Sequence, residues 1–349
     1  MAMLIELEDL RPTVNQIRIF SCIALAINLM VLLLIVFGTP KAMIQYGRLL
    51  LLYQIVSTLV DWGFGSVLFP IFCFPVVGGV PFGWLANFDV PTDLMVIIGC
   101  TMVFALAGAN GALFFQRQQA ILPESHLLKM TKHAPMYIFL YTTGLQGFTF
   151  SATILHFNDS EAIRYAKLQD YPELLLFFQH PKYYGFQVEA GIYIISMCAV
   201  YVAIMIFYTI ETTVPTYYYM NKVTHLLSSS TQKMQRQLLT CLCIQSGFSM
   251  GFIISPVLIA VICVLGNLRG FESYNLILPC LITLHGVSSS LCIPILYLPY
   301  RRFLFQKLNL ILPAKLSIES AKVATPLASL QISSGIISST NRMGIVYQA

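Results

Sequence analysis

The fold of this chain is decided by its last long apolar stretch, which reads LILPCLITLHGVSSSLCIPILYLPYRR from Leu276 to Arg302. Its apolar part, Leu276 to Tyr300, is long enough to cross the core of a bilayer, which takes about 20 helical residues. It carries His285 near its middle and ends at two arginines, a basic end typical of membrane spans. The stretch therefore predicts a transmembrane helix, against which the other apolar runs can be measured.

The composition predicts several such helices. Of the 349 residues, 57% are hydrophobic and 10% are charged, against roughly 25% charged residues in a soluble domain. Seven runs are long enough to span a bilayer, and they lie at residues 16–37, 49–72, 92–115, 135–155, 190–210, 238–266 and 276–300. We therefore expect an all-α membrane protein, a seven-transmembrane-helix bundle over residues 16–300. The nine cysteines lack metal-ligand or CxxC spacing, so we expect most of them to be small buried hydrophobes.

The flanking segments predict three further regions. Residues 1–15 lack the basic start and the cleavage site of a signal peptide, so we expect an extracellular N-terminus followed by an uncleaved anchor. Residues 301–312 are expected to form an amphipathic juxtamembrane helix that Pro313 stops. Its apolar side chains recur at helical spacing, at Phe303, Leu304, Leu308 and Ile311. Residues 313–349 are rich in Ser and Thr, which predicts a disordered cytoplasmic tail.

The charges of the connections predict the orientation of the bundle. If the N-terminus is outside, 14 of the 20 Lys and Arg residues lie on the inner side and 11 of the 15 Asp and Glu residues on the outer side. The positive-inside rule therefore favours an outer N-terminus and an inner C-terminus. The sequon Asn158-Asp159-Ser160 falls in the outer connection 156–189 and makes Asn158 a candidate glycosylation site.

Four polar side chains within the predicted spans are candidates for function. A carboxylate inside a membrane must face the bundle interior, pair or be protonated, so Asp61 is either a packing node or part of an ion- or proton-sensitive switch. His285 lies among small residues and is either a packing histidine or a ligand contact. Gln146 and Gln245 are expected to form hydrogen bonds between helices.

The sequence lacks the motifs of common enzymes. There is no HExxH, GxSxG, P-loop or dinucleotide fingerprint. No second intramembrane aspartate accompanies Asp61, which excludes a two-aspartate intramembrane protease. There is also no basic patch interleaved with aromatics of the kind that binds nucleic acid. We therefore expect a protein that is not an enzyme, with no cofactor and no metal site.

Five short motifs follow one another in the order of the spans. They are Phe37-Gly38-Thr39-Pro40-Lys41-Ala42-Met43, Asp61 with Pro70 and Pro75, Phe114-Phe115-Gln116-Arg117, Gln235-Arg236-Gln237-Leu238 leading to Gln245 and Pro256, and His285-Gly286 through Pro299-Tyr300-Arg301. Over residues 20–305 they resemble nematode serpentine chemoreceptors of class H (Srh), or of the sister class I (Sri), in the Str superfamily of G-protein-coupled receptors. In that family Glu-Asn usually stands where this chain has Phe115-Gln116, so the resemblance leaves Arg117 without an acidic partner.

The resemblance implies a chemosensory G-protein-coupled receptor in the plasma membrane of sensory neuron cilia. It would bind a small environmental molecule, such as a volatile or lipid-like compound, and activate a heterotrimeric G protein. From their depth in the spans, we expect the ligand pocket to be lined by Thr101, Phe104, Tyr193, Phe252, Ser255, Thr283 and His285. The G-protein-facing residues are expected to be Arg117, Lys233, Arg236, Tyr300, Arg301 and Arg302.

Two other functions remain open from the sequence. A multi-pass transporter or ligand-gated channel subunit could use Asp61 and His285 as a polar pathway, although the sequence has no internal repeat and only one intramembrane acid. A receptor-like protein that serves only in assembly or trafficking would fit the altered motif before Arg117.

Overall fold

The computed structural model describes residues 11–88, 90–123, 126–158, 161–222, 229–268 and 277–311. The chain divides into two compact units, Met1–Tyr300 and Arg301–Ala349. The first unit contains the helical bundle. Residues 1–10 of the predicted N-terminus (1–15) and the whole predicted tail (313–349) lie outside the described residues, and residues 11–15 belong to the first helix.

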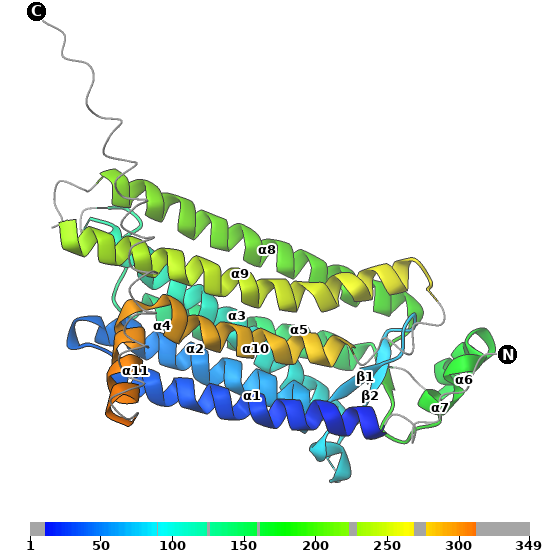
Figure 1. Cartoon of the computed structure of the whole chain (residues 1–349). Coiled ribbons are helices and arrows are strands. Elements are labelled where there is room, and N and C mark those ends of the chain that lie inside the picture. The colour runs from blue at the N-terminus through cyan, green and yellow to red at the C-terminus, as the bar shows by residue number, and fades with distance from the viewer. Residues whose placement is uncertain are drawn as a thin grey trace, which may run out of the picture. The chain divides into compact units, whose positions relative to one another are not determined.

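Seven long helical segments build the first unit (Figure 1). They are α1 (Arg11–Gly38), α2 (Ile44–Trp62) continued by the π-helical turn Gly63–Val67, α3 (Thr92–Ile121), α4 (Ala134–Leu140) joined to α5 (Gly147–His156) by the π-helical turn Tyr141–Gln146, α8 (Val188–Lys222), α9 (Ser229–Leu265) and α10 (Ile277–Leu296). Six of them are long and apolar enough to cross a membrane. The other is the fourth segment, residues 134–156, which changes from α-helix to π-helix and back to α-helix. Only helices or closed barrels satisfy all backbone hydrogen bonds in lipid, and apolar residues on every side of these helices suit that solvent. The expectation of a seven-helix bundle is confirmed.

The helices pack in a closed order. Neighbouring segments from α1 to the fourth and from α8 to α10 contact one another, α10 returns to α1 and α2, and α3 contacts α2, α4, α5, α8 and α9. Small residues let other helices approach α3 closely, and they include Gly99, Gly108, Ala109, Gly111 and Ala112. The position of α3 therefore allows one helix to contact much of the bundle.

The ends of several helices differ from the apolar runs of the sequence. The second run was expected to reach residue 72, but its helix ends at Val67 and Pro70–Phe72 forms strand β1. Phe69 has a φ of 36° and the next residue is a proline, so the helical hydrogen bonds stop here. The seventh run divides into α10 and α11 (Leu298–Ile311), and Pro299 fits the first turn of a new helix, where its missing N–H is not needed.

A small antiparallel sheet lies at one end of the bundle, which we call the sheet end. Its order is β1 (Pro70–Phe72), β2 (Gly78–Pro81) and β3 (Tyr184–Gly185), with Ile71 opposite Val80. The 156–189 connection supplies β3 and the helices α6 (Glu161–Asp170) and α7 (Leu175–Phe178). A buried cluster joins the connection between α2 and α3 and the connection between α5 and α8 to the start of α1. It includes Val14, Ile17, Phe69, Ile71, Val80, Leu174, Phe177 and Tyr183. Short 3-10 turns occupy Lys41–Met43, Trp84–Asn87 and Pro172–Leu174.

Candidate functional site: an apolar cavity joined to a buried arginine

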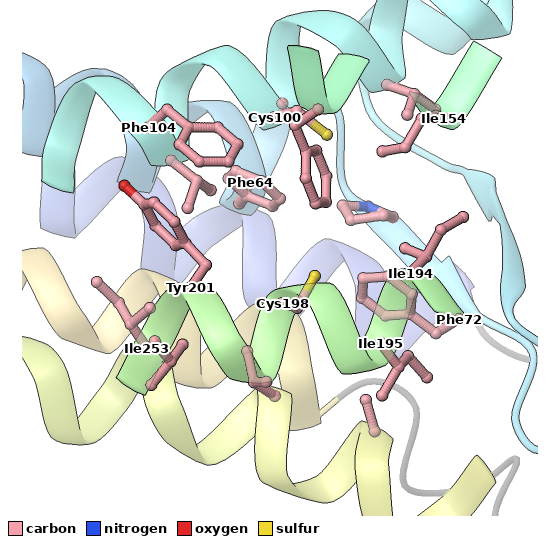
Figure 2. A pocket seen from close by; sticks show the side chains of 18 of the residues that line it. Phe64, Phe72, Cys100, Phe104, Ile154, Ile194, Ile195, Cys198, Tyr201 and Ile253 are labelled. Atoms are coloured by element: carbon pink, nitrogen blue, oxygen red, sulfur yellow. The ribbon is translucent and has the colours of Figure 1, made fainter. Parts of the chain in front are cut away.

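A cavity of about 440 Å³ lies among α3, α8 and α9 next to the sheet. Figure 2 shows Phe104 on α3 facing Tyr201 on α8, with Cys100 and Cys198 farther along the same two helices, toward the sheet. Residues of β1 and β2 line the cavity as well, and its walls are nearly all aliphatic and aromatic. Small-molecule sites typically measure roughly 300–1,000 Å³ and are mostly apolar, so the cavity has the size and lining of a ligand pocket.

The polar side chains of the cavity wall are few. They are Tyr53, Thr92, Asn110, Tyr184, Tyr201, Ser249 and His285. Asn110 Oδ1 accepts a hydrogen bond from Ser246 Oγ at 2.8 Å, which joins α3 to α9. A few polar groups in an apolar wall are what fixes the orientation of a ligand in such sites.

The carboxylate of Asp61 on α2 is held by donors from α1 and α10. Its Oδ2 accepts a hydrogen bond from Asn28 Nδ2 at 2.8 Å, and its Oδ1 lies 3.2 Å from His285 Nδ1 and 3.1 Å from the backbone N–H of Gly286. Asp61 is 1% exposed and His285 is fully buried, which fits the rule that an acid inside a membrane must be paired. A Cβ at Gly286 would overlap the carboxylate, so only glycine leaves room for it. The cluster ties three helices together at mid-bundle.

A chain of hydrogen bonds begins at the cavity wall. The hydroxyl of Tyr53 lies 2.9 Å from Ser249 Oγ and 3.0 Å from Ser289 Oγ. Gln245 Nε2 donates to the same Ser289 oxygen at 3.0 Å. Because these residues come from α2, α9 and α10, a shift of one helix must change the hydrogen bonds of the other two.

The chain continues toward the other end of the bundle, which we call the Arg117 end. Tyr297 donates its hydroxyl hydrogen to Gln245 Oε1 at 3.0 Å, and its oxygen lies 3.0 Å from the hydroxyl of Tyr46. The guanidinium of Arg117 stacks on the Tyr46 ring, with Cζ 3.4 Å from the ring centroid. Arg117 Nη1 donates to Gln235 Oε1 at 3.1 Å. A continuous path of polar contacts therefore links the cavity wall to Arg117.

Arg117 itself is only 4% exposed. Its Nε and Nη2 atoms are buried and have no hydrogen-bond partner among the described residues. A tyrosine ring and a neutral amide thus hold the guanidinium in place of the acidic partner that the chain lacks before Arg117. A cation stacked on a desolvated aromatic ring gains about 2 kcal/mol. Two unused donors make this a place where a group from another molecule could bind.

Comparison with known proteins decides the family. A family model described as the serpentine type 7TM GPCR chemoreceptor Srh matches residues 13–310. The chain belongs to the Srh family. This confirms the resemblance to class H, and it makes the protein a multi-pass membrane receptor of the GPCR type, from a family of receptors and not of enzymes.

A solved structure supports the fold of the Srh chain. The crystal structure of squid rhodopsin is similar to it with a TM-score of 0.51 and 12% identity, covering 85% of this chain and 80% of the rhodopsin chain. A search of the curated proteins finds no match. At this identity the likeness concerns the arrangement of helices alone.

The predicted pocket residues of this Srh receptor fall into two groups. Phe104 and His285 line the cavity. The other five lie outside its lining, although they come from the same helices: Thr101, Tyr193, Phe252, Ser255 and Thr283. Tyr193 is 55% exposed. Thr283 is buried beside Gly65 and donates its hydroxyl hydrogen to the carbonyl of Pro279.

The predicted G-protein-facing residues are also divided. Arg117 and Tyr300 are buried, and the Tyr300 hydroxyl lies 2.9 Å from Thr39 Oγ1. Lys233 and Arg236 are exposed near the start of α9. Arg301 and Arg302 belong to α11 in the second compact unit.

The remaining predicted residues lie in the first unit. Gln245 is a central member of the hydrogen-bond chain. Gln146 ends the π-helical turn of the fourth segment, and its Oε1 has no hydrogen-bond partner among the described residues. Asn158 forms an isolated bridge with Phe186, and the rest of its sequon is outside the described residues. All nine cysteines lie in the described ranges, and none of them forms a disulfide there. No group of three His, Cys, Asp or Glu suited to a metal occurs in those ranges.

Sequence reasoning missed several polar side chains of the path and of the contacts around Asp61. They are Asn28, Tyr46, Tyr53, Gln54, Gln235 and Tyr297. A signal was present on α2, where Gln54, Ser57, Thr58 and Asp61 recur at helical spacing in an apolar run and are all buried. Such a polar stripe in a membrane helix marks its buried face, because lipid offers no hydrogen-bond partners.

Proposed function

We propose that this Srh receptor binds a small apolar molecule in the cavity and activates a heterotrimeric G protein at the Arg117 end. The observation that carries the proposal is the path of polar contacts from Tyr53 at the cavity wall to Arg117. The family description, a chemoreceptor, supports a ligand of environmental origin. A plasma-membrane location in sensory cilia agrees with such a ligand.

The mechanism needs two helix arrangements that a ligand binds unequally. A ligand shifts such an equilibrium only by its difference in affinity for the two states. Filling the cavity would move α8 or α9 against α3, and the Ser249 and Gln245 contacts of α9 would then change together. The Tyr297 and Tyr46 contacts follow, and Arg117 would exchange Tyr46 and Gln235 for acceptors on the G protein.

The orientation belongs to the same proposal. The excess of Lys and Arg in the connections of the Arg117 end favours a cytoplasmic position for that end. The sheet end and Asn158 would then face outward. Replacing Asn158 by Gln should remove a glycan from receptor made in a eukaryotic cell, seen as one faster band on a gel. Full-length receptor with no glycan in either version would argue against this orientation.

The coupling is tested by a second-messenger assay in cells that express the receptor. Replacing Arg117 by Ala should abolish constitutive and odorant-evoked signals, because the buried guanidinium would be lost. Arg48→Ala is the matched control, since Arg48 is an exposed arginine near the start of α2, at the Arg117 end of the bundle. Equal signals from the native receptor and Arg117→Ala would contradict the proposal. Ion flux through purified receptor in lipid without a G protein would favour the transporter or channel instead.

A further inference from the structure

We propose that the ligand is an apolar carbonyl compound, a ketone, aldehyde or ester, whose oxygen accepts a hydrogen bond from Nε2 of His285. The inference rests on the proposed function, because it places the ligand in the cavity between α3, α8 and α9. It adds the chemical class of the ligand and the atom that recognises it.

The first observation is an unused nitrogen at the cavity wall. His285 lines the cavity and is fully buried, and its Nε2 has no hydrogen-bond partner among the described residues. The Nδ1 edge of the ring is taken by Asp61, which does not line the cavity. Nε2 is therefore the polar atom that the ring can offer to a ligand. A buried polar atom without a partner is unfavourable, so a ligand that satisfies it gains affinity.

The second observation concerns the proton on that nitrogen. All three partners of Asp61 are donors or can donate: Asn28 Nδ2, His285 Nδ1 and the N–H of Gly286. This set satisfies an ionised carboxylate, which can only accept. An ionised acid within a membrane needs a cation beside it, and His285 is the ionisable side chain in contact with Asp61. If the ring is that cation, it carries a hydrogen on both nitrogens, and Nε2–H is the donor for the ligand oxygen.

The third observation is the character of the rest of the wall. The Tyr53 hydroxyl has partners in Ser249 and Ser289, and Asn110 has one in Ser246. Apart from the hydroxyl of Tyr201, which also lacks a hydrogen-bond partner among the described residues, the cavity wall near these groups offers a ligand mainly hydrocarbon. A molecule with one acceptor oxygen and an apolar body therefore matches the wall. A site built around one hydrogen bond discriminates strongly against an analogue that lacks it.

The test measures binding to the full-length receptor, purified into lipid nanodiscs without a G protein. Three radiolabelled probes share one carbon skeleton: a straight-chain methyl ketone, the corresponding secondary alcohol and the alkane. A hydrogen bond from a charged donor should make the ketone bind about tenfold tighter than the alkane. A ketone that binds no tighter than the alkane overturns the proposal, whether the alcohol binds tightly or none of the three binds.

Two variants assign the effect to one atom. In His285→Asn the side-chain amide can still donate to Asp61 from near the Nδ1 position, but Nε2 is gone, so the ketone preference should fall to about twofold or less. Tyr201→Phe removes the other unpartnered hydroxyl and should keep the native ratio of ketone to alkane affinity. Loss of the preference in Tyr201→Phe but not in His285→Asn overturns the assignment to His285. If His285→Asn does not fold, the proposal is still tested by the ketone-to-alkane affinity ratio of the native chain and by whether Tyr201→Phe keeps that ratio.

The outcome is separable from the proposed function. Signalling that depends on Arg117 can be present while the ketone shows no preference, and then only the ligand class fails. Ketone selectivity can equally be present in a receptor that activates no G protein, and then only the coupling fails.

Discussion

The sheet end and the Arg117 end of the bundle differ in how their interiors are packed. At the sheet end, apolar side chains surround an open cavity of about 440 Å³, and few polar side chains line it. At the Arg117 end, Tyr46, Tyr297, Tyr300 and Arg117 are each at most 4% exposed and are held by specific polar contacts. Apolar walls accept many shapes at small cost, whereas hydrogen-bonded side chains exchange between discrete arrangements. The sheet end is therefore suited to bind ligands of varied shape, and the Arg117 end is suited to switch between two states.

The Asp61 cluster lies between the two ends, and its His285 also lines the cavity. It joins α1, α2 and α10 through contacts that leave no free space. We therefore expect substitutions here to affect folding most, those at the Arg117 end to affect signalling, and those at the sheet end to have smaller effects.

The largest effect is expected for Gly286→Ala. The new methyl group would displace the Asp61 carboxylate from its donors, and breaking a buried charge pair lowers the free energy of unfolding by about 3–5 kcal/mol. The measurement is thermal unfolding of purified receptor. Gly251→Ala is the control, because nothing lies within 4 Å of its Cβ position, and alanine in a helix gains about 0.5–1 kcal/mol over glycine. Similar unfolding temperatures for the two variants would refute the tight packing at Asp61.

The next effect is expected for Gln235→Leu, which removes the hydrogen bond to Arg117 but not the Tyr46 ring. A hydrogen bond to a charged group contributes about 1.5–3 kcal/mol, so signalling without ligand should rise about tenfold if this contact holds the resting state. A second-messenger assay at equal surface expression checks this. Gln237→Leu, two residues along α9, should leave the basal signal unchanged. An unchanged or lower basal signal in Gln235→Leu would show that this contact does not restrain the receptor.

A smaller effect is expected for Tyr297→Phe. The ring stays in place, but the hydrogen bonds with Gln245 and Tyr46 are lost, which should lower the free energy of unfolding by about 1–2 kcal/mol. Tyr217→Phe serves as the control, because its hydroxyl bonds to Thr240 at an exposed position, where loss should cost about 0.5 kcal/mol or less. The two variants are compared by thermal unfolding. Equal losses would mean that burial adds nothing to the Tyr297 contacts.

The smallest effect is expected at His180, in the connection at the sheet end. Burial, and then the nearby charge of Lys182, lowers the pKa of His180 below its ordinary value of 6.5. Between the lowered pKa and 6.5 the unfolded chain binds more protons, so stability is fully present above about pH 6.5 and falls as the pH drops through this window. His180→Asn should flatten this dependence in unfolding temperatures measured from pH 7.5 to 5. The same slope in both proteins would mean that His180 does not titrate differently on folding.

The sequence by itself determined the number and the approximate position of the helices. Apolar runs of about 20 residues have one stable form in lipid, so the seven-helix bundle and the Srh family could be predicted before any coordinates. The sequence also determined that Asp61 needs a partner, since a carboxylate cannot stay unpaired in a membrane. It gave no signal for the antiparallel sheet, because strands of two to four residues have no recognisable period.

Only the tertiary structure decided which side chains meet. Hydropathy reports the depth of a residue in the bilayer but not the direction in which it points, because helices such as α3 are apolar on every side. Depth alone therefore selected Thr101, Phe252 and Ser255, which lie outside the cavity lining, together with Phe104, which lines it. The partners of Asp61 and Arg117 are equally hidden, because His285 and Gln235 lie 224 and 118 residues away along the chain. Packing among α1, α2, α3, α9 and α10 brings them together, and no local sequence pattern encodes that contact.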